Sequence, residues 1–136
     1  MKLLLMLPIL SLLIYSPQKS EIKKILIKYV DFNIETFVAV RCNSFEERFG
    51  EEVRTIIINK KKELDTFDHY LNELSKDENE KLFPDVRLKM EIIRNNGIID
   101  TLCMDNVRIS LNNHPMKNSK KFRSMIKGIL ATSKTK

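Results

Sequence analysis

Hydrophobic and polar positions alternate most regularly in residues 86–105. Four apolar residues in the first half of this stretch are separated by single charged residues: Val86, Leu88, Met90 and Ile92. This period of two predicts a strand with one buried face. Asn96-Gly97 follows, and that pair favours a two-residue turn in which both positions have positive φ. The turn predicts a hairpin in which Met90 faces Cys103, so that both side chains point to the buried face.

The first half of the chain shows a similar alternation in residues 22–30 and 34–42. The short link at residues 31–33 predicts that these two strands form a second hairpin. Residues 43–52 are polar and acidic around two phenylalanines, which indicates a loop or a single helical turn that buries one of them. Residues 53–58 end in three consecutive isoleucines. A run that is apolar on both sides predicts a central strand covered on both faces.

Two stretches change to the helical spacing of three and four residues. The first spans residues 60–75, with Asn59 as the expected N-cap. Its apolar stripe consists of Leu64, Phe67, Leu71 and Leu74. The second begins after a cap at Asn118 or Ser119. Its apolar stripe consists of Phe122, Met125, Ile126, Ile129 and Leu130. Both patterns predict amphipathic helices that pack one face on a sheet.

Residues 107–111 predict a sixth short strand between the hairpin and the second helix, and residues 114–117 are close enough to pair briefly with it after a turn. The order of elements is therefore three strands, a helix, three strands and a helix. This order, βββαβββα, predicts an α+β fold: a mainly antiparallel sheet of five to six strands with two packed helices. One domain over residues 21–131 accounts for all of these elements, and the polar residues 132–136 are expected to fray.

Residues 1–20 differ from the rest of the chain, and we interpret them as a secretory signal peptide. A lysine precedes an apolar run over residues 3–15, which is too short to span a bilayer comfortably, since a spanning helix takes about 20 residues. A polar exit follows, and cleavage near Ser16, Gln18 or Ser20 is open. The competing interpretations are an uncleaved anchor and a buried helix of the domain. We expect an exported protein, either periplasmic or extracellular.

The formal net charge of +6 is unevenly distributed. Residues 117–136 contain seven basic and no acidic side chains, whereas residues 21–116 contain 15 basic and 18 acidic ones. The second helix carries basic residues on its predicted outer face: Lys120, Lys121, Arg123 and Lys127. Such a face either attracts an acidic partner or makes a weak contact with an anionic membrane, or it only solvates the helix. Nucleic acid is not an expected partner, because Phe122, the only aromatic residue of this helix, belongs to the buried stripe.

Side chains suited to catalysis are scarce. His69 lies in the first helix close to Asp65 and Asp68, so the sequence allows a histidine base oriented by a carboxylate. The simpler interpretation places His69 at the edge of the apolar stripe. His114 has no cysteine or carboxylate at zinc spacing. The three glycines form no phosphate-binding or dinucleotide-binding loop, and no cofactor is expected.

Cys42 and Cys103 are the two cysteines of the chain. In an exported protein such a pair is first expected to form a disulfide. Both residues fall at core-facing positions of predicted strands, and neighbouring strands would bring their β-carbons within bonding range. The alternative is two buried free thiols that act as small apolar residues.

Together these patterns favour an exported, non-enzymatic protein that binds another protein. The most concrete version is an inhibitor or immunity-type protein that neutralises an enzyme by plugging its cleft. The alternatives are a small exported enzyme that uses His69 with a neighbouring carboxylate, and a membrane-surface module that uses the basic helix. A cleft that converges on His69 would favour the enzyme, whereas a convex body with a protruding acidic loop would favour the inhibitor.

Overall fold

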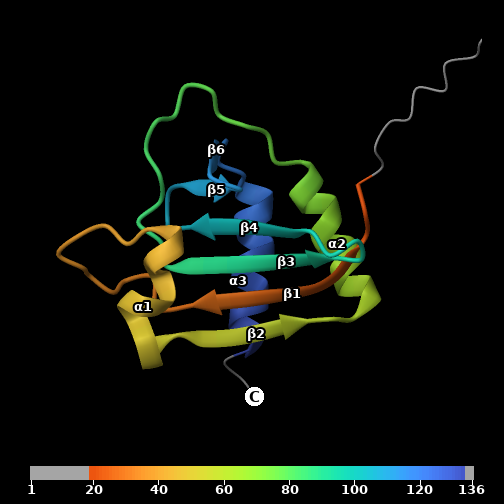
Figure 1. Ribbon diagram of the computed structural model, residues 1–136, viewed down its shortest axis with the longest axis horizontal. Coiled ribbons are helices and arrows are strands. Elements are labelled where there is room, and N and C mark those ends of the chain that lie inside the picture. Colours follow the sequence, from red (N-terminus) through yellow and green to blue (C-terminus); the bar gives the residue numbers. More distant parts are fainter. Residues whose placement is uncertain (1–18, 134–136) are drawn as a thin grey trace, which may run out of the picture.

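The fold is built on one six-stranded antiparallel sheet with the strand order β2-β1-β3-β4-β5-β6 (Figure 1). The structure is a computed structural model and describes residues 19–133. The strands are β1 (Ile22–Tyr29), β2 (Arg54–Ile58), β3 (Leu88–Arg94), β4 (Ile99–Met104), β5 (Ile109–Leu111) and β6 (His114–Met116). The helices are α1 (Phe45–Phe49), α2 (Lys61–Asn72) and α3 (Lys120–Ser133), with short 3-10 turns at Cys42–Ser44 and Gly50–Glu52. The predicted α+β class and antiparallel sheet are confirmed, whereas nearly all of the predicted signal peptide lies outside the described residues.

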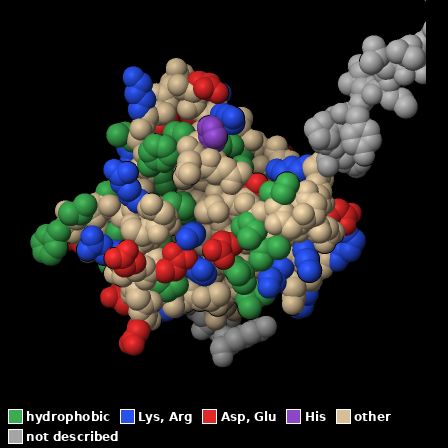
Figure 2. Space-filling model, in the orientation of Figure 1, with side chains coloured by type: hydrophobic (Ala, Val, Ile, Leu, Met, Phe, Trp, Pro, Cys, Tyr) green, Lys and Arg blue, Asp and Glu red, His purple; other side chains and the backbone are tan. Residues whose placement is uncertain are grey.

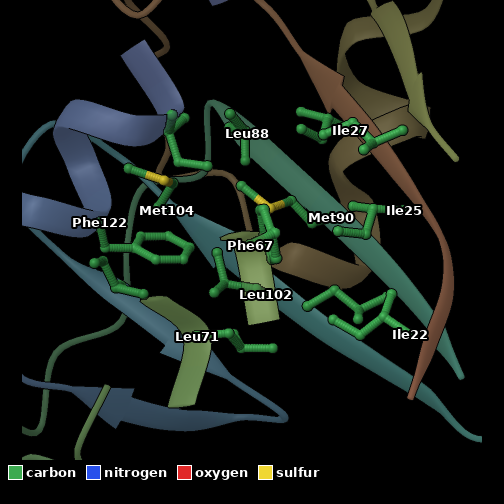
Figure 3. Close-up of a cluster of buried hydrophobic side chains, with 14 of the residues drawn as sticks. Ile22, Ile25, Ile27, Phe67, Leu71, Leu88, Met90, Leu102, Met104 and Phe122 are labelled. Atoms are coloured by element: carbon green, nitrogen blue, oxygen red, sulfur yellow. The ribbon is translucent and has the colours of Figure 1, made fainter. Parts of the chain in front are cut away.

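The helices α2 and α3 lie behind the sheet in Figure 1 and cover its larger hydrophobic face. The strands contribute alternate residues to this core, because successive side chains of a strand point to opposite faces. The strand residues in it include Ile25, Ile27, Leu88, Met90, Ile92, Leu102 and Met104. Phe67 of α2 and Phe122 of α3 meet over these strands with ring centroids 5.7 Å apart (Figure 3). The apolar stripes predicted for both helices therefore form the main core.

A second, smaller hydrophobic cluster lies on the opposite face of the sheet, beneath α1. It consists of Val30, Val40, Phe45, Phe49, Val86 and Cys103. The rings of Phe45 and Phe49 pack edge to face with centroids 5.3 Å apart. Glu46 of the same helix accepts hydrogen bonds of 3.0 Å from Lys28 and Lys89 of the sheet. The predicted helical turn is confirmed, and it buries both of its phenylalanines rather than one.

The central hairpin forms, but its loop has three residues instead of two. The Arg94 amide donates to the Ile98 carbonyl at 2.9 Å, and the Gly97 amide donates to the Arg94 carbonyl at 3.0 Å. Within this loop only Gly97 adopts positive φ, at +84°. This geometry is that of a turn followed by a glycine in a bulge. The turn with two positive φ values occurs instead at Asn112 and Asn113, between β5 and β6.

The extra loop residue shifts the predicted register of the hairpin by one position. Met90 pairs with Leu102, and Cys103 pairs with Lys89. Because the side-chain period of a strand is two, this shift moves Cys103 to the other face of the sheet. The prediction that Cys103 shares a face with Met90 is therefore wrong, and Cys103 belongs to the smaller cluster.

Residues 34–42 do not form the predicted strand. Most of this segment is an irregular loop, and its backbone is bonded to the side chains of Asp85 and Arg87 instead of to a neighbouring strand. A strand would place Val38 and Val40 on the same face, but Val38 is 65% exposed and Val40 is buried. The alternation misleads here because the loop is held at Ile34, Thr36 and Val40 by the side chains of Asp85 and Arg87, and not by pairing with a neighbouring strand.

The strand β2 is an edge strand, not the predicted central one. Ile56 and Ile58 pack on the helix-covered core, whereas Ile57 points to the other face and is 58% exposed. A continuous apolar run therefore does not require two covered faces. The helix α2 also begins differently, because Lys60 instead of Asn59 occupies its N-cap position, without a side-chain cap.

The two edge strands of the sheet, β6 and β2, differ in whether another segment bonds to their outer side. The edge at β6 is covered by residues 75–77: the Asp77 amide donates to the Pro115 carbonyl at 2.9 Å, and the Lys117 amide donates to the Ser75 carbonyl at 2.8 Å. No strand within residues 19–133 pairs with the outer edge of β2. Within residues 19–133 the sheet therefore has one covered and one open edge.

Candidate functional site

Two loops with exposed apolar side chains line a common groove. We call residues 30–41 the Phe37 loop, and residues 73–87, between α2 and β3, the Phe83 loop. Their exposed apolar side chains are Phe37, Val38, Leu82 and Phe83. The groove has a volume of about 640 Å³, and its lining includes residues 38–43 and 81–84. The Phe37 loop projects to the left of the sheet in Figure 1, and Figure 2 shows apolar side chains at its outer end.

The first half of the Phe37 loop is held by Arg87, whose side chain is 7% exposed. The guanidinium donates to the Ile34 carbonyl at 3.0 Å and to the Thr36 hydroxyl at 3.2 Å. It also binds the Asp85 carboxylate through two hydrogen bonds, of 2.8 and 3.0 Å. This two-point geometry fixes the plane of the guanidinium, so Arg87 orients the loop as well as neutralising Asp85. The Phe49 ring lies 5.6 Å below the guanidinium and completes its surroundings.

The second half of the Phe37 loop is held at Val40. The Val40 amide donates to the Asp85 carboxylate at 2.7 Å, and the Val40 carbonyl accepts from the Val86 amide at 2.9 Å. The Asp85 amide in turn donates to the Asp105 carboxylate at 2.8 Å. The Asp85 carboxylate therefore links the two loops directly, because it binds Val40 on one and Arg87 at the end of the other.

A disulfide between Cys42 and Cys103 anchors the chain just beyond the loop, with the two Cα atoms 5.9 Å apart. This spacing is usual for a disulfide. The predicted bond is confirmed, but the two cysteines do not lie on neighbouring strands. Cys42 begins a 3-10 turn that crosses the face of the sheet to which Cys103 points.

These anchors leave three consecutive residues free to contact a partner. The loop is bonded at Thr36 and at Val40, and only Phe37, Val38 and Ala39 lie between these positions. All three are exposed, and the Phe37 side chain is fully so. A large aromatic side chain at the tip of a loop fixed on both sides is the arrangement expected of a binding anchor, because little order has to be created on binding.

We expect the Phe37 loop to loosen in acid as Asp85 becomes protonated. Burial alone would raise the pKa of Asp85, but hydrogen bonds from Arg87 and the Val40 amide outweigh burial and hold this pKa below its ordinary value. The stabilisation is therefore complete above the ordinary pKa of about 4, and it is lost as pH falls through the lowered value. An acid titration followed by the NMR shift of the Val40 amide should detect this change.

Asp85→Asn should abolish this titration, and Asp65→Asn on the outer side of α2 provides the matched control. The Asp65 variant should keep the acid transition of the Val40 amide. A transition that persists in Asp85→Asn would contradict the role of this carboxylate.

His69 lies apart from the loops. Its side chain is 68% exposed, and its Nε2 lies 3.6 Å from a carboxylate oxygen of Glu73, one helical turn further on. The ion-pair partner is therefore neither of the predicted carboxylates, Asp65 and Asp68. The His69 ring packs edge to face on Tyr70 with centroids 5.3 Å apart, and it does not line the groove. The His69 side chain therefore lies at the edge of the apolar stripe of α2.

The four basic residues predicted for the outer face of α3 do not form one surface. Lys120, Lys121 and Lys127 are exposed. Arg123 is half-buried and donates to the Asp105 carbonyl at 2.6 Å and to the Asn118 side chain. Burial lowers the pKa of Arg123, and the nearby Asp105 only partly offsets this effect. Arg123 thus ties α3 to the β4–β5 connection, and the exposed basic set is reduced to the three lysines.

The described part of the chain offers few other sites. Among residues 19–133, no group of three or more histidine, cysteine, aspartate and glutamate side chains is arranged to hold a metal ion. None of the helices in the same range is both long enough and apolar enough to cross a membrane. No protein-family model, curated protein or solved structure matches this chain. Function is therefore inferred from the loops and their contacts.

Sequence patterns missed the Asp85–Arg87 pair and the exposed position of Phe37. A weak signal for the pair exists, because Asp85 follows Pro84 directly and precedes the strand by only three residues. Phe37 gave a signal as well, because a strand would place this phenylalanine on the same face as the charged residues Glu35 and Arg41. Neither signal distinguishes a loop from a strand without the contacts of Arg87.

Proposed function

We propose that this chain is an exported, non-enzymatic binding protein that inserts the tip of the Phe37 loop into a pocket of a partner protein. The observation that carries the proposal is the fully exposed Phe37 side chain on a loop held on both sides. Burying one phenylalanine side chain stabilises a complex by roughly 1.5–3 kcal/mol. Because the loop is already ordered, little of this free energy is lost in fixing its backbone.

The partner that fits this tip is an enzyme with an apolar pocket. An inhibitor-type function would then consist of filling that pocket with the tip of the Phe37 loop. The tip projects beyond the body, so it suits a concave surface better than a flat one (Figure 2). An acidic protruding loop was the expected mark of an inhibitor, but the exposed tip, residues 37–39, carries no charge. The pocket it enters should therefore be apolar instead of basic. Leu82 and Phe83 add a second apolar contact at the rim of the groove.

Export of the protein is supported by the disulfide, since such bonds form and persist in oxidising compartments. The proposal keeps a signal peptide within residues 1–20 and places its cleavage site before Lys19. The Ser20 carbonyl accepts a 2.5 Å hydrogen bond from Arg94, whose side chain is nearly inaccessible to solvent. The Ser20 hydroxyl also accepts from the Asn96 amide at 3.3 Å. Cleavage before Lys19 keeps both contacts, whereas cleavage after Ser20 removes them.

Mass spectrometry of the exported protein should therefore show the loss of about 16 to 18 residues, as expected for cleavage near Ser16 or Gln18. The control is the same chain expressed without export, which should keep its first residues. A mature protein that begins at Glu21 would contradict the role given to Ser20. An intact Met1 in the exported fraction would contradict the signal peptide itself.

The Phe37 anchor is tested by affinity capture from cell-envelope extracts with three baits: the natural chain, Phe37→Ala and Ile98→Ser. Ile98 is an exposed apolar residue directly after the hairpin loop, so its variant controls for the loss of surface hydrophobicity. A specific partner should be retained by the natural chain and by Ile98→Ser, and its affinity for Phe37→Ala should fall about thirty-fold, as for a hot-spot residue of about 2 kcal/mol. If the captured protein is an enzyme, its activity should fall on titration with the natural chain. Identical sets of proteins on all three baits would contradict the proposal.

A further inference from the structure

The outer edge of β2 has one protective feature, the charged residue Arg54, which shares a face with Ile56 and Ile58. Edge strands are also protected by a proline, a bulge or a covering segment, and β2 has none of these three within the described residues. The edge at β6 has both Pro115 and the covering residues 75–77. Residues 53–60, in contrast, contain no proline, and no bulge interrupts the pairing of β2 with β1. Every second residue of β2 therefore presents an unpaired N–H and C=O group to a further strand.

Charge at the two ends of this edge is of opposite sign. Glu51 and Glu52 precede β2, whereas Lys60 and Lys62 follow it, and all four side chains are exposed. The backbone is extended at Val53, with φ −69° and ψ 123°, and at Lys60, with φ −79° and ψ 128°, whereas Glu52 is the last residue of the 3-10 turn that precedes β2. An antiparallel copy of this segment would place the acidic end of one chain next to the basic end of the other. The edge is therefore complementary to itself.

We infer that two copies of this chain associate through β2, antiparallel and about a two-fold axis at Ile56, so that their sheets form one continuous sheet. Centring the pair on Ile56 places Arg54 opposite Ile58 and brings Glu52, at the end of the 3-10 turn, to the level of Lys60 of the second copy. Centring it on Ile57 would place Arg54 opposite Lys60, a repulsive pair. Centring it on Thr55 would leave Glu52 opposite Ile58. Charge thus favours the register centred on Ile56. The contact is isologous, as in other two-fold dimers.

Packing on the helix side of the sheet supports the same arrangement. A groove of about 820 Å³ runs beside β2, and its apolar lining includes Ile56, Ile58, Met125 and Ile129. Ile56 is only half-buried in the single chain. In the dimer the two Ile56 side chains meet across the axis, at a distance of about 5 Å between their β-carbons. Each copy thereby covers the open end of the groove of the other.

The test uses charge reversal in the full chain with its disulfide intact. Glu51→Lys/Glu52→Lys and Lys60→Glu/Lys62→Glu should each weaken self-association about ten-fold or more in sedimentation equilibrium, because the facing positions 52 and 60 then carry like charges and the second substitution adds a like charge beside them. An equimolar mixture of the two variants should restore the dimer, since the lysines of one then face the glutamates of the other. Lys120→Glu/Lys121→Glu is the matched control, and its self-association should equal that of the natural chain.

Hydrogen exchange provides a second measurement on the natural chain. The amides of β2 should become better protected as protein concentration rises, whereas those of β6 should not change. A natural chain that is monomeric at all concentrations would overturn the inference. Dimers that both reversals leave intact, or variants whose mixture does not reassociate, would also overturn it, because another surface or another kind of partner strand would then use this edge.

Discussion

Removal of the disulfide by Cys42→Ala/Cys103→Ala is expected to lower the free energy of unfolding by about 4 kcal/mol. The bond joins residues 61 positions apart, so it removes much of the conformational freedom of the unfolded chain. Alanine is the appropriate replacement because Cys103 is fully buried and a serine hydroxyl there would lack a partner. Urea unfolding monitored by circular dichroism measures the change.

Thiol titration provides the control for this experiment. The unfolded, unreduced natural chain should contain no free thiol. The double variant should unfold at a lower urea concentration and with a slope at least as steep, because its unfolded chain is no longer cross-linked. Two free thiols in the natural chain, or an unchanged urea midpoint in the variant, would show that the bond does not contribute as described.

Truncation of Phe122 is expected to destabilise the fold by about 3–5 kcal/mol, the usual range for a buried aromatic side chain. Phe122 is fully buried and packs on Phe67, so Phe122→Ala leaves a cavity where the two helices meet over the sheet. Thermal and urea unfolding should both detect the loss, and Ile126→Ala should act in the same direction. These substitutions test the packed stripe of α3.

Replacing the three exposed lysines of α3 by glutamine, at Lys120, Lys121 and Lys127, is the matched experiment on the other face of that helix. Exposed charges typically contribute less than about 1 kcal/mol, so stability should change little. The triple variant should also bind the partner captured through Phe37 as the natural chain does. Binding to anionic vesicles that is lost in this variant and fades with added salt would instead identify α3 as a functional surface.

The parts of the fold that follow from sequence are those whose side chains pack on one large surface. The stripes of α2 and α3 and the alternation of β1 and β3 are such parts, and all four elements occur where the pattern predicts them. The register of the hairpin could not be predicted in the same way. Asn96-Gly97 is compatible with a two-residue loop and with a three-residue loop. The three-residue loop is closed by backbone hydrogen bonds of Arg94 to Ile98 and Gly97, which form only in the folded chain.

The candidate site was harder to predict because its contacts join distant residues. Arg87 bonds to the chain more than fifty positions away, at Ile34 and Thr36. In the sequence Arg87 appears only as a charged residue between two apolar ones, which suggests exposure. Burial of Arg87 becomes favourable only when Asp85 and the Ile34 carbonyl are both in reach. The disulfide was predicted from the compartment and the number of cysteines, although the geometry expected for it was wrong.

The division of the hydrophobic residues between the two faces of the sheet has a consequence for how such a protein can diverge. The main core lies under α2 and α3, whereas residues 37–39 contribute no buried side chain to either cluster. Substitutions at these positions therefore leave the folding free energy almost unchanged while altering the surface offered to a partner. A lineage that meets a changing target can replace Phe37 repeatedly without first acquiring compensating changes elsewhere. The anchors at Asp85, Arg87 and the disulfide are the positions at which such change should be slow.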